Sequence, residues 1–285
     1  MVFKKLKIFF EMIKIEHTLF ALPFAYIGAL LVDRQVPSAH DLVWITLAMV
    51  GARTAAMSLN RIIDRHIDTR NPRTAGRAIP RGMLSVVEVW VYALVSLGLL
   101  LVSAYNLSQL AFKLFPVALA VLFIYPYTKR FTWLCHLILG LALGLAPLGA
   151  WVAIAGRFDL APLLLAVGVM FWVAGFDIIY ACDDFDFDRA EGVHSIPARF
   201  GIRPGLKISS AFHMAAIGLF LGVGLVVHLG VLYFTGMLLA AVLLFYQHRV
   251  ISPEDLSRSG MAFFNLNAGL SISTFIFTLA DILVK

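Results

Sequence analysis

The sequence is short of charge and of cysteine, and both shortages narrow what the chain can be. Only 14% of its 285 residues are Asp, Glu, Lys or Arg, against about 25% in soluble domains. Because 61% of the residues are hydrophobic, this composition excludes an ordinary soluble protein and indicates a membrane protein. Cys135 and Cys182 are the only cysteines. They lack a CxxC spacing, so they are typical of small packing residues and carry little information on the redox compartment.

The strict alternation of apolar and polar residues that a membrane β-barrel needs is also missing. The apolar runs are therefore predicted to be helices, which satisfy their own backbone groups in lipid. Runs of about 17 to 25 residues can cross a bilayer. Nine such spans are predicted, at residues 17–32, 41–59, 83–105, 109–126, 133–155, 160–180, 206–227, 229–246 and 261–283. The expected fold is one all-α integral membrane domain, residues 1–285, built as a bundle of nine transmembrane helices.

The N-terminal segment lacks the features of a cleaved signal peptide. Glu11, Lys14 and Glu16 interrupt any apolar core, and no small-residue cleavage site precedes the first span. Residues 1–16 are predicted instead to form an amphipathic helix on the membrane face, with its lysines toward the headgroups. The side chains expected to face lipid are Phe3, Ile8, Phe9 and Ile13.

The distribution of positive charge predicts the orientation in the membrane. Most of the 23 Lys and Arg residues fall on one side if the segments between the nine spans alternate between the two sides. The positive-inside rule then places the N-terminus in the cytoplasm and the C-terminus outside, in the cell (inner) membrane. The net charge of +6 follows from this topology, so nucleic acid is not an expected partner.

One polar stretch, SLNRIIDRHIDTRNPRTAGRAIPRG, follows the second predicted span. Asn60, Asp64 and Asp68 are four residues apart in it. At 100° per residue each side chain is displaced by only about 40° from the one before, so all three share one face of a helix. His66 lies between the two acids but on the other side of this helix and is predicted to be a surface residue.

A second acidic stretch, AGFDIIYACDDFDFDRAEG, ends the sixth predicted span. Asp177, Asp184 and Asp188 stand at offsets 0, 7 and 11, which on an ideal helix return to within about 20° of one line. Asp183 and Asp186 lie off this line and are expected to face solvent or to support the other acids. The sequence thus predicts two acidic stripes at the same membrane face.

Carboxylates this dense beside lipid repel one another, so a bound cation is expected. Amide and carboxylate oxygens suit Mg²⁺, which typically takes one or two carboxylates plus phosphate oxygens and water. Basic side chains on the same side fit a diphosphate, because guanidinium groups clamp its oxygens in pairs. The basic candidates are Arg70, Arg73, Arg77, Lys129, Arg130 and Arg199.

Each motif alone has a simpler explanation. Acids at helix ends often only cap or solvate the helix, and basic loops mark the cytoplasmic side. Two regularly spaced stretches, each followed by arginines at the same membrane face, favour a shared site instead.

Arg53 and Asp177 are charges within predicted spans. Arg53 precedes Asn60 by seven residues, two helical turns or about 10.5 Å deeper, and an arginine inside a membrane usually faces a cavity or a partner. One interpretation is an Arg53–Asp177 ion pair that joins two helices. The other is that Arg53 receives an anionic group of a substrate, such as a carboxylate.

The two stretches resemble the NxxxDxxxD and DxxYAxxDxxxD motifs of the UbiA superfamily of membrane prenyltransferases. The similarity continues through RTAGRAIPRG, YPYTKRFTWL and APLGAWVA, covers about residues 15 to 205, and is greatest to the 4-hydroxybenzoate polyprenyltransferase branch. It implies a central cavity, cytoplasmic capping loops and a lateral opening to lipid. One departure is Arg61, since many relatives have Asp at this position.

The resemblance also implies a reaction and roles for the residues. A polyprenyl diphosphate would be the donor and an aromatic acid, 4-hydroxybenzoate, the acceptor. Arg53 would hold the acceptor carboxylate, and Asp177 would orient or deprotonate the phenol or shield the cation. The residues expected to bind diphosphate are Arg73, Arg77, Lys129, Arg130 and Arg199. The residues expected to bind Mg²⁺ are Asn60, Asp64, Asp68, Asp184 and Asp188. The aromatic residues expected to face the allylic cation are Tyr125, Phe171, Phe176 and Tyr180.

Two alternatives remain open from the sequence. The same chemistry on a dihydroxynaphthoate acceptor would serve menaquinone biosynthesis. An ion-coupled transporter would also use charges in the membrane, but its binding groups are expected near the bilayer centre, whereas most of these acids lie at helix ends.

Overall fold

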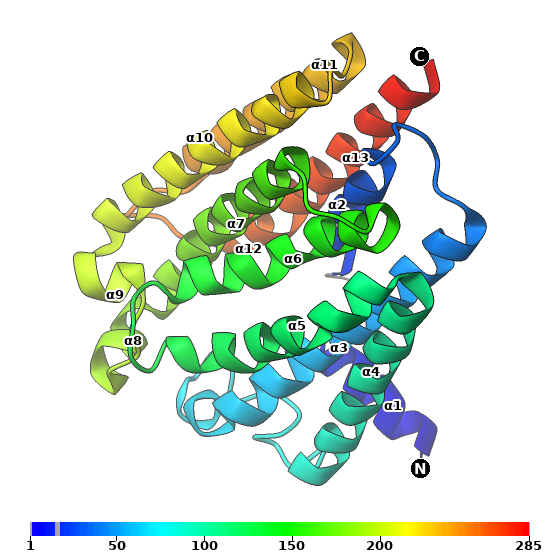
Figure 1. Ribbon diagram of the computed structural model, residues 1–285. Coiled ribbons are helices and arrows are strands. Elements are labelled where there is room, and N and C mark those ends of the chain that lie inside the picture. Colours follow the sequence, from blue (N-terminus) through cyan, green and yellow to red (C-terminus); the bar gives the residue numbers. More distant parts are fainter. Residues whose placement is uncertain (1, 15–17, 285) are drawn as a thin grey trace.

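The protein is a helical bundle in the computed structural model, which describes residues 2–14 and 18–284 (Figure 1). Apart from one isolated bridge between Ser252 and Asp255, the regular structure of the described residues is helical, which confirms the all-α prediction. The helices are α1 Val2–Met12, α2 Thr18–Leu30, α3 Ala39–Arg70, α4 Val86–Leu107, α5 Gln109–Thr128, α6 Cys135–Ala155, α7 Leu160–Ala181, α8 Phe185–Glu191, α9 Ile196–Phe200, α10 Ile202–Val226, α11 Val231–Val250, α12 Ser259–Met261 and α13 Asn267–Val284. A 3₁₀ turn, η2 (Cys182–Asp184), follows α7, and a π-helical turn, η3 (Ala262–Leu266), precedes α13.

Eight helical segments of the described residues are long and apolar enough to cross a membrane. The helix α2 is apolar but has only 13 residues, and residue 17, where the first predicted span begins, lies outside the described residues. The structure therefore confirms a multi-pass membrane fold. The count of nine spans stays a prediction.

The N-terminal helix α1 packs against protein and not against lipid along part of its apolar face. Phe9 is 4% exposed and Ile13 is 1% exposed, in a cluster with Leu84 and Val89 at the start of α4. Lys5 forms an ion pair with Glu88. The prediction that Phe9 and Ile13 face lipid is wrong, because α4 and the segment before it cover them; Phe3 lies outside the described side chains.

Close backbone contacts at glycines pack α3 against α4 and α6 against α7. A Cβ atom at Gly51 of α3 would lie 2.7 Å from the Ser96 carbonyl oxygen of α4, and one at Gly144 of α6 would lie 2.5 Å from the Ala166 carbonyl oxygen of α7. Small residues allow such backbone approach in membrane helix pairs. The acidic stretches lie at the ends of α3 and α7, so these contacts help to place both.

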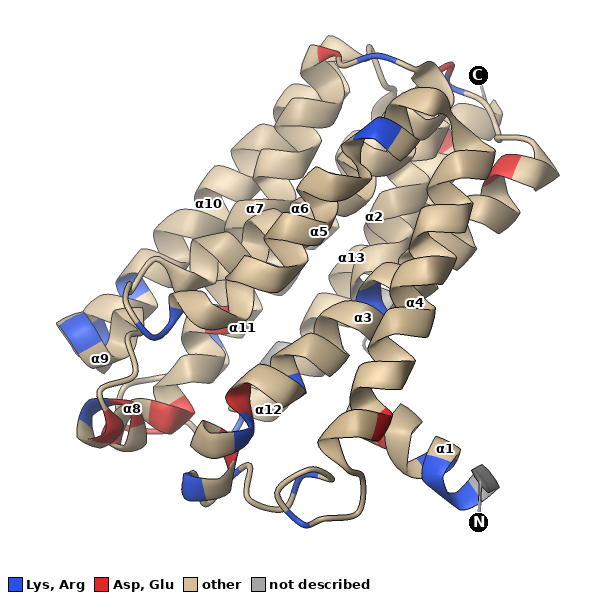
Figure 2. Ribbon diagram, turned by 60° about the horizontal axis from the view of Figure 1, so that its bottom comes forward, with Lys and Arg blue, Asp and Glu red and all other residues tan. Residues whose placement is uncertain are grey.

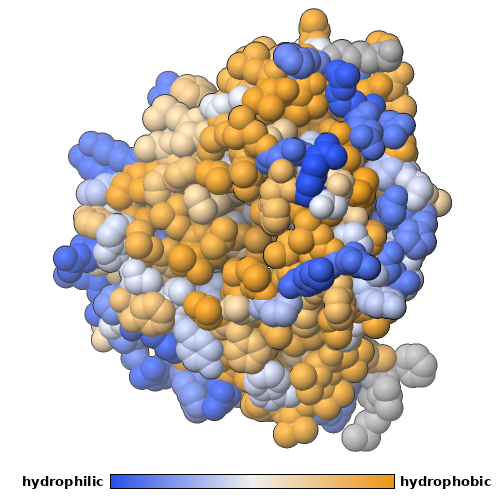
Figure 3. All heavy atoms as spheres, in the orientation of Figure 1, coloured by the Kyte–Doolittle hydropathy of each residue, from blue (hydrophilic) through white to orange (hydrophobic). Residues whose placement is uncertain are grey.

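The surface of the bundle is largely apolar around its middle. Figure 3 shows a broad area of hydrophobic side chains on the visible face, with most hydrophilic side chains toward its edges and a few within it. Exposed apolar residues such as Val87, Leu94 and Val95 of α4 contribute to this surface. A surface of this kind suits contact with lipid.

Charged segments gather at one end of the bundle, here called the charged end. It consists of residues 71–85, 129–134, 182–201 and 251–258. Figure 2 shows acidic and basic segments around α8, α9 and the end of α3. The C-terminus lies at the other end of the bundle from α1 (Figure 1). The charged end is where both acidic stretches lie.

Candidate active site

The first acidic stretch is one continuous helical stripe. It lies on α3, which Ser38 caps by accepting a hydrogen bond from the Asp41 N–H and which runs without a break to Arg70. Asn60 Nδ2 donates to Asp64 Oδ2 at 3.0 Å. Asp64 and Asp68 are 1% and 4% exposed. The spacing therefore predicted correctly that these side chains share one face.

Basic side chains lie directly on the buried carboxylates of α3. Lys129 and Arg130, at the end of α5, both contact Asp64, Arg130 at 3.1 Å. Arg77 Nη1 lies 2.6 Å from Asp68 Oδ1. The second oxygen of Asp68, Oδ2, is buried and has no hydrogen-bond partner among the described residues.

The second acidic stretch is not one straight helix. The helix α7 ends at Ala181, the 3₁₀ turn η2 follows, and α8 begins at Phe185 after Asp184, which has φ −100° and ψ 10°. The expectation that Asp177, Asp184 and Asp188 form one line on an ideal helix is therefore wrong. Tertiary contacts, and not helical register, place the three acids.

The two acidic stretches meet at the charged end. Asn71, which follows α3 directly, donates from Nδ2 to Asp184 Oδ1 at 2.8 Å. Arg73 Nε donates to the same oxygen at 2.9 Å, and a second guanidinium nitrogen contacts Asp184 Oδ2. Arg70 also pairs with Glu191 of α8 at 2.7 Å. Two segments more than a hundred residues apart in the chain are thus joined at one place.

Arg73 forms the most elaborate of these contacts. Its guanidinium carbon lies 4.6 Å above the centre of the Tyr180 ring, and its Nη1 donates to the Tyr180 hydroxyl. Burial alone would lower the pKa of Arg73, but the hydrogen bond to Asp184 and the nearby negative groups raise the pKa above its ordinary value. Arg73 stays charged at any pH that the protein experiences.

Asp177 lies deeper in the bundle and pairs with a histidine. His136 of α6, which is 2% exposed, has its Nδ1 atom 2.7 Å from Asp177 Oδ2. The side chain of Asp177 is 24% exposed.

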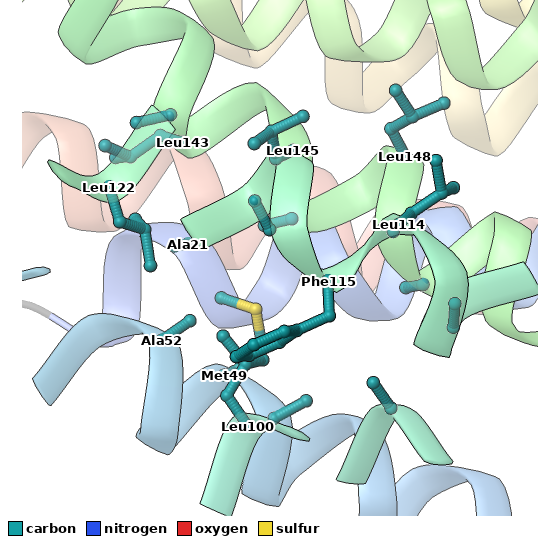
Figure 4. Close-up of a pocket in the computed structure, with 18 of the residues that line it drawn as sticks. Ala21, Met49, Ala52, Leu100, Leu114, Phe115, Leu122, Leu143, Leu145 and Leu148 are labelled. Atoms are coloured by element: carbon teal, nitrogen blue, oxygen red, sulfur yellow. The ribbon is translucent and has the colours of Figure 1, made fainter. Parts of the chain in front are cut away.

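An apolar cavity of about 320 Å³ extends from the region of Tyr125 toward the opposite end of the bundle. Figure 4 shows Met49 and Ala52 of α3, Phe115 of α5 and Leu145 of α6 facing this space from different helices. Among the described residues that line the cavity, Arg53 is the charged one. Arg53 therefore lines the cavity, and its role in binding an anionic group stays a prediction.

The aromatic residues predicted around the cation separate into two groups. Tyr125 lines the cavity, and its hydroxyl donates to the Ala56 carbonyl at 2.9 Å. Phe171 and Phe176 instead belong to the core around Trp172, where the Phe176 and Trp172 ring centres are 5.3 Å apart. The ring of Tyr180 lies under the guanidinium group of Arg73. Only Tyr125 of the four is among the residues that line the cavity.

Some predicted residues lie outside the contact network. Arg199 of α9 is exposed, and its side chain makes no hydrogen bond or ion pair to the described residues. Asp186 and His66 are exposed as predicted. Asp183 is exposed as well but accepts a hydrogen bond from Ser259 Oγ at 2.6 Å, which ties η2 to α12.

Three residues of the network were not singled out from the sequence. Asn71 continues the stripe of Asn60, Asp64 and Asp68 by three more residues, so the helical period contained a signal for it. His136 is a lone titratable side chain in an apolar span. Ser195 caps α9 and also donates from Oγ to Asp188 Oδ2 at 2.8 Å; its cap position before Ile196 and Pro197 was the available signal.

The arrangement holds charge of both signs at the end of an apolar cavity. No group of three or more His, Cys, Asp or Glu side chains is close enough to hold a metal ion by itself within residues 2–14 and 18–284. The acids are instead bridged by Lys and Arg side chains, which are suited to bind phosphate oxygens.

Comparisons with known proteins point to one family. Residues 21–269 match the UbiA prenyltransferase family. A 4-hydroxybenzoate octaprenyltransferase from Vibrio cholerae serotype O1 is 32% identical over 249 residues, 86% of each chain. A 4-hydroxybenzoate octaprenyltransferase from Yersinia pseudotuberculosis serotype IB is 33% identical over 242 residues, 83% of this chain and 82% of its own.

Solved structures share the fold. The apo structure of a UbiA homologue from Aeropyrum pernix K1 has a TM-score of 0.82 and 36% identity, covering 94% of this chain and 98% of its own. A UbiA homologue from Archaeoglobus fulgidus bound to DMAPP and Mg²⁺ has a TM-score of 0.72 at 21% identity, covering 97% and 99%. The chain therefore belongs to the UbiA prenyltransferase family, as its two acidic motifs indicate.

Proposed function

We propose that the protein transfers a polyprenyl group from polyprenyl diphosphate to the ring of 4-hydroxybenzoate, with Mg²⁺ as cofactor, in respiratory quinone biosynthesis. The observation that carries the proposal is the junction of the two acidic stretches through Asn71, Arg73 and Asp184, together with the apolar cavity that begins near Tyr125. The names of the bacterial relatives support the choice of acceptor.

The cavity is a suitable place for the prenyl chain of the donor. Its lining is apolar except at Arg53 and Tyr125, so it would bury hydrocarbon and keep water from the reacting carbon. Arg53 would bind the carboxylate of the aromatic acid, since a guanidinium pairs with a carboxylate in bidentate geometry. Donor chain and acceptor would then approach each other at the end of the cavity nearest the acids.

The acid residues fit Mg²⁺. Asp68 Oδ2 is a buried carboxylate oxygen with no partner in the described structure, and a hard cation satisfies such an oxygen. Asn60, Asp64, Asp68, Asp184 and Asp188 would hold the metal. Mg²⁺, when bound, would stabilise the negative charge that develops on the leaving diphosphate.

The basic residues would bind the diphosphate itself. Arg73, Arg77, Lys129 and Arg130 now contact carboxylates, and each would turn toward diphosphate oxygens once the donor is present. Arg199 lies exposed on α9 and would reach the diphosphate only if α9 moved toward it.

The reaction proposed is electrophilic substitution on the aromatic ring. The allylic C–O bond breaks and its electron pair leaves with the diphosphate. The ring carbon beside the phenol attacks the allylic carbon, a C–C bond forms, and the ring loses a proton to restore aromaticity. Asp177 would orient or deprotonate the phenol, or shield the cation.

The membrane setting completes the proposal. Residues 1–285 would form one domain with nine spans, in which α2 supplies the ninth. The charged end would face the cytoplasm with its loops capping the site, the C-terminus would lie outside, and residues 1–16 would lie along the face of the cell (inner) membrane. The helix α1 and the end of α13 lie at opposite ends of the bundle (Figure 1), which supports an odd number of crossings.

The test is a product assay with the purified full chain in lipid nanodiscs. It is incubated with one polyprenyl diphosphate and, separately, 4-hydroxybenzoate and a dihydroxynaphthoate, and the products are weighed by mass spectrometry. We expect prenylated 4-hydroxybenzoate with Mg²⁺ and no product with a chelator. If only dihydroxynaphthoate is prenylated, it is the acceptor in place of 4-hydroxybenzoate. If neither aromatic compound is prenylated, the proposal is overturned.

A further inference from the structure

The segment His194–Ile196, between α8 and α9, contacts three separate parts of the candidate site. The His194 N–H donates to the carbonyl of Lys129 at 2.7 Å. Ser195 Oγ donates to Asp188 at 2.8 Å, and the Ile196 N–H donates to His136 Nε2 at 3.2 Å. His136, which accepts from Ile196, is in turn hydrogen-bonded to Asp177.

The contact with Ile196 fixes the proton on His136. A backbone N–H only donates, so His136 Nε2 must accept and cannot carry a hydrogen. The proton therefore sits on Nδ1, which lies 2.7 Å from Asp177 Oδ2 and donates to it. An imidazole of this tautomer orients Asp177 through Oδ2 and leaves the other oxygen, Oδ1, for a substrate.

The packing of α6 on α7 sets the distance between the two side chains. A Cβ atom at Gly140 would collide with the Met170 carbonyl, and one at Gly144 would lie 2.5 Å from the Ala166 carbonyl oxygen. The backbones approach closely at both places, and His136 lies one turn from Gly140 on the side toward Asp177. His136 is 2% exposed, so it acts through Asp177 and does not contact a substrate.

The groups around this pair come from several helices. Cys135 of α6 lies beside His136 and donates from Sγ to the His194 carbonyl at 3.3 Å. Asp188 of α8 is held by Ser195. Ile196 thus contacts His136, and its neighbour Ser195 contacts Asp188. The same short segment therefore positions both Asp177, through His136, and Asp188.

We propose that His136 is a positioning residue for the transfer reaction, because its hydrogen bond orients the carboxylate of Asp177 toward the aromatic acceptor. The segment His194–Ile196 keeps His136 in the tautomer that this hydrogen bond requires. This inference rests on the proposed function, because it assigns Asp177 to the acceptor. It differs from a merely structural role, in which His136 only fills space between α6 and α7.

The test is a double-mutant cycle of His136→Phe and Asp177→Asn, with His66→Phe as the matched control on an exposed histidine. Turnover is measured with polyprenyl diphosphate and 4-hydroxybenzoate varied in turn, each with the other saturating, and folding is checked by thermal unfolding. Supporting hydrogen bonds of this kind are worth about 10-fold to 100-fold in activity. We expect H136F to lower kcat by about that factor, with the KM for polyprenyl diphosphate unchanged.

His136→Gln, which keeps an N–H donor, is expected to restore most of the activity. On the D177N background H136F is expected to have no further effect.

Three results would overturn the inference. The first is normal turnover of H136F where D177N is impaired. The second is a loss caused by H136F that is equally large on the D177N background, since His136 would then act independently of Asp177. The third is a loss in H136Q as large as in H136F. If H136F does not fold, His136→Met takes its place in the cycle with the same outcomes. Normal turnover of D177N would instead refute the proposed role of Asp177 and leave the diphosphate chemistry standing.

Discussion

The two acidic stretches meet at one place but differ in their local structure. In the first, Asn60, Asp64 and Asp68 lie on the unbroken helix α3, and the i, i+4 spacing alone puts them on one face. In the second, the turn η2 separates Asp177 on α7 from Asp188 on α8. The comparison teaches that residue spacing locates side chains only where the helix is continuous. Where the helix breaks, partner residues decide the geometry.

The largest effect should come from removing one acid of each stretch. Asp64→Asn and Asp184→Asn are each expected to lower turnover by at least about 100-fold, since both are proposed to bind the metal directly and losing a ligand costs more than losing a group that supports one. Equal losses in the product assay would show that the continuous and the broken stretch are equally necessary.

Asp186→Asn is the matched control, because Asp186 lies two residues from Asp184 but is exposed. It is expected to keep wild-type turnover. Full activity in either D64N or D184N, with the protein folded, would mean that the corresponding stretch is not part of the site.

A smaller effect should follow from weakening the contact that joins the stretches. Arg73→Lys keeps the positive charge but removes the guanidinium group, whose several N–H donors contact both oxygens of Asp184 and the Tyr180 hydroxyl. We expect turnover to fall by about tenfold, the usual scale for a supporting contact, mainly through a higher KM for polyprenyl diphosphate. Arg81→Lys, at an exposed position of the same loop, should change nothing. If the KM of R73K for polyprenyl diphosphate equals that of the wild type, the contact between the two acidic stretches is not needed to bind diphosphate.

Much of this arrangement could be predicted from the sequence, for identifiable reasons. Apolar runs gave the helices, and the i, i+4 rule gave the stripe on α3, because both depend on local periodicity. The break after Ala181 could not be predicted, because the sequence there continues without Gly or Pro and tertiary contacts bend the chain. The pairing of His136 with Asp177 was missed for a similar reason, since it depends on how α6 packs on α7.

The burial of Phe9 and Ile13 shows the same limit. An apolar helix face predicts burial, but it does not tell lipid from protein as the neighbour. Likewise, four aromatic residues near the motifs were equal candidates from the sequence, and only the packing separates Tyr125 at the cavity from Phe171 and Phe176 in the core.

The contact of α6 with α7 can be tested by stability. Gly140→Ala adds a methyl group against the Met170 carbonyl, and overpacking of this kind costs about 1–3 kcal/mol. The variant should unfold at lower temperature and should disturb the second stretch, which α7 carries, more than the first. Gly149→Ala on the same helix, where nothing lies within 4 Å of the added carbon, is expected to be at least as stable as the wild type. Equal stability of the two variants would contradict the close approach.

The smallest effect should come from Ser259→Ala, which removes the hydrogen bond to Asp183 in the broken stretch. Loss of one such bond costs about 1 kcal/mol, so turnover is expected to fall by about fivefold at most. Ser257→Ala, at an exposed serine of the preceding loop, is the control for thermal unfolding and for turnover. A loss as large as that of D184N would show that Asp183, and not only Asp184, belongs to the site.

The most direct measurement is the binding of a non-hydrolysable polyprenyl diphosphate analogue to the wild type, D64N and D184N, each with and without Mg²⁺. If both acidic stretches hold one metal–diphosphate site, the wild type binds the analogue tightly only with Mg²⁺, and either substitution alone removes the Mg²⁺-dependent part. Retention of wild-type, Mg²⁺-dependent binding by either folded variant would contradict the shared site.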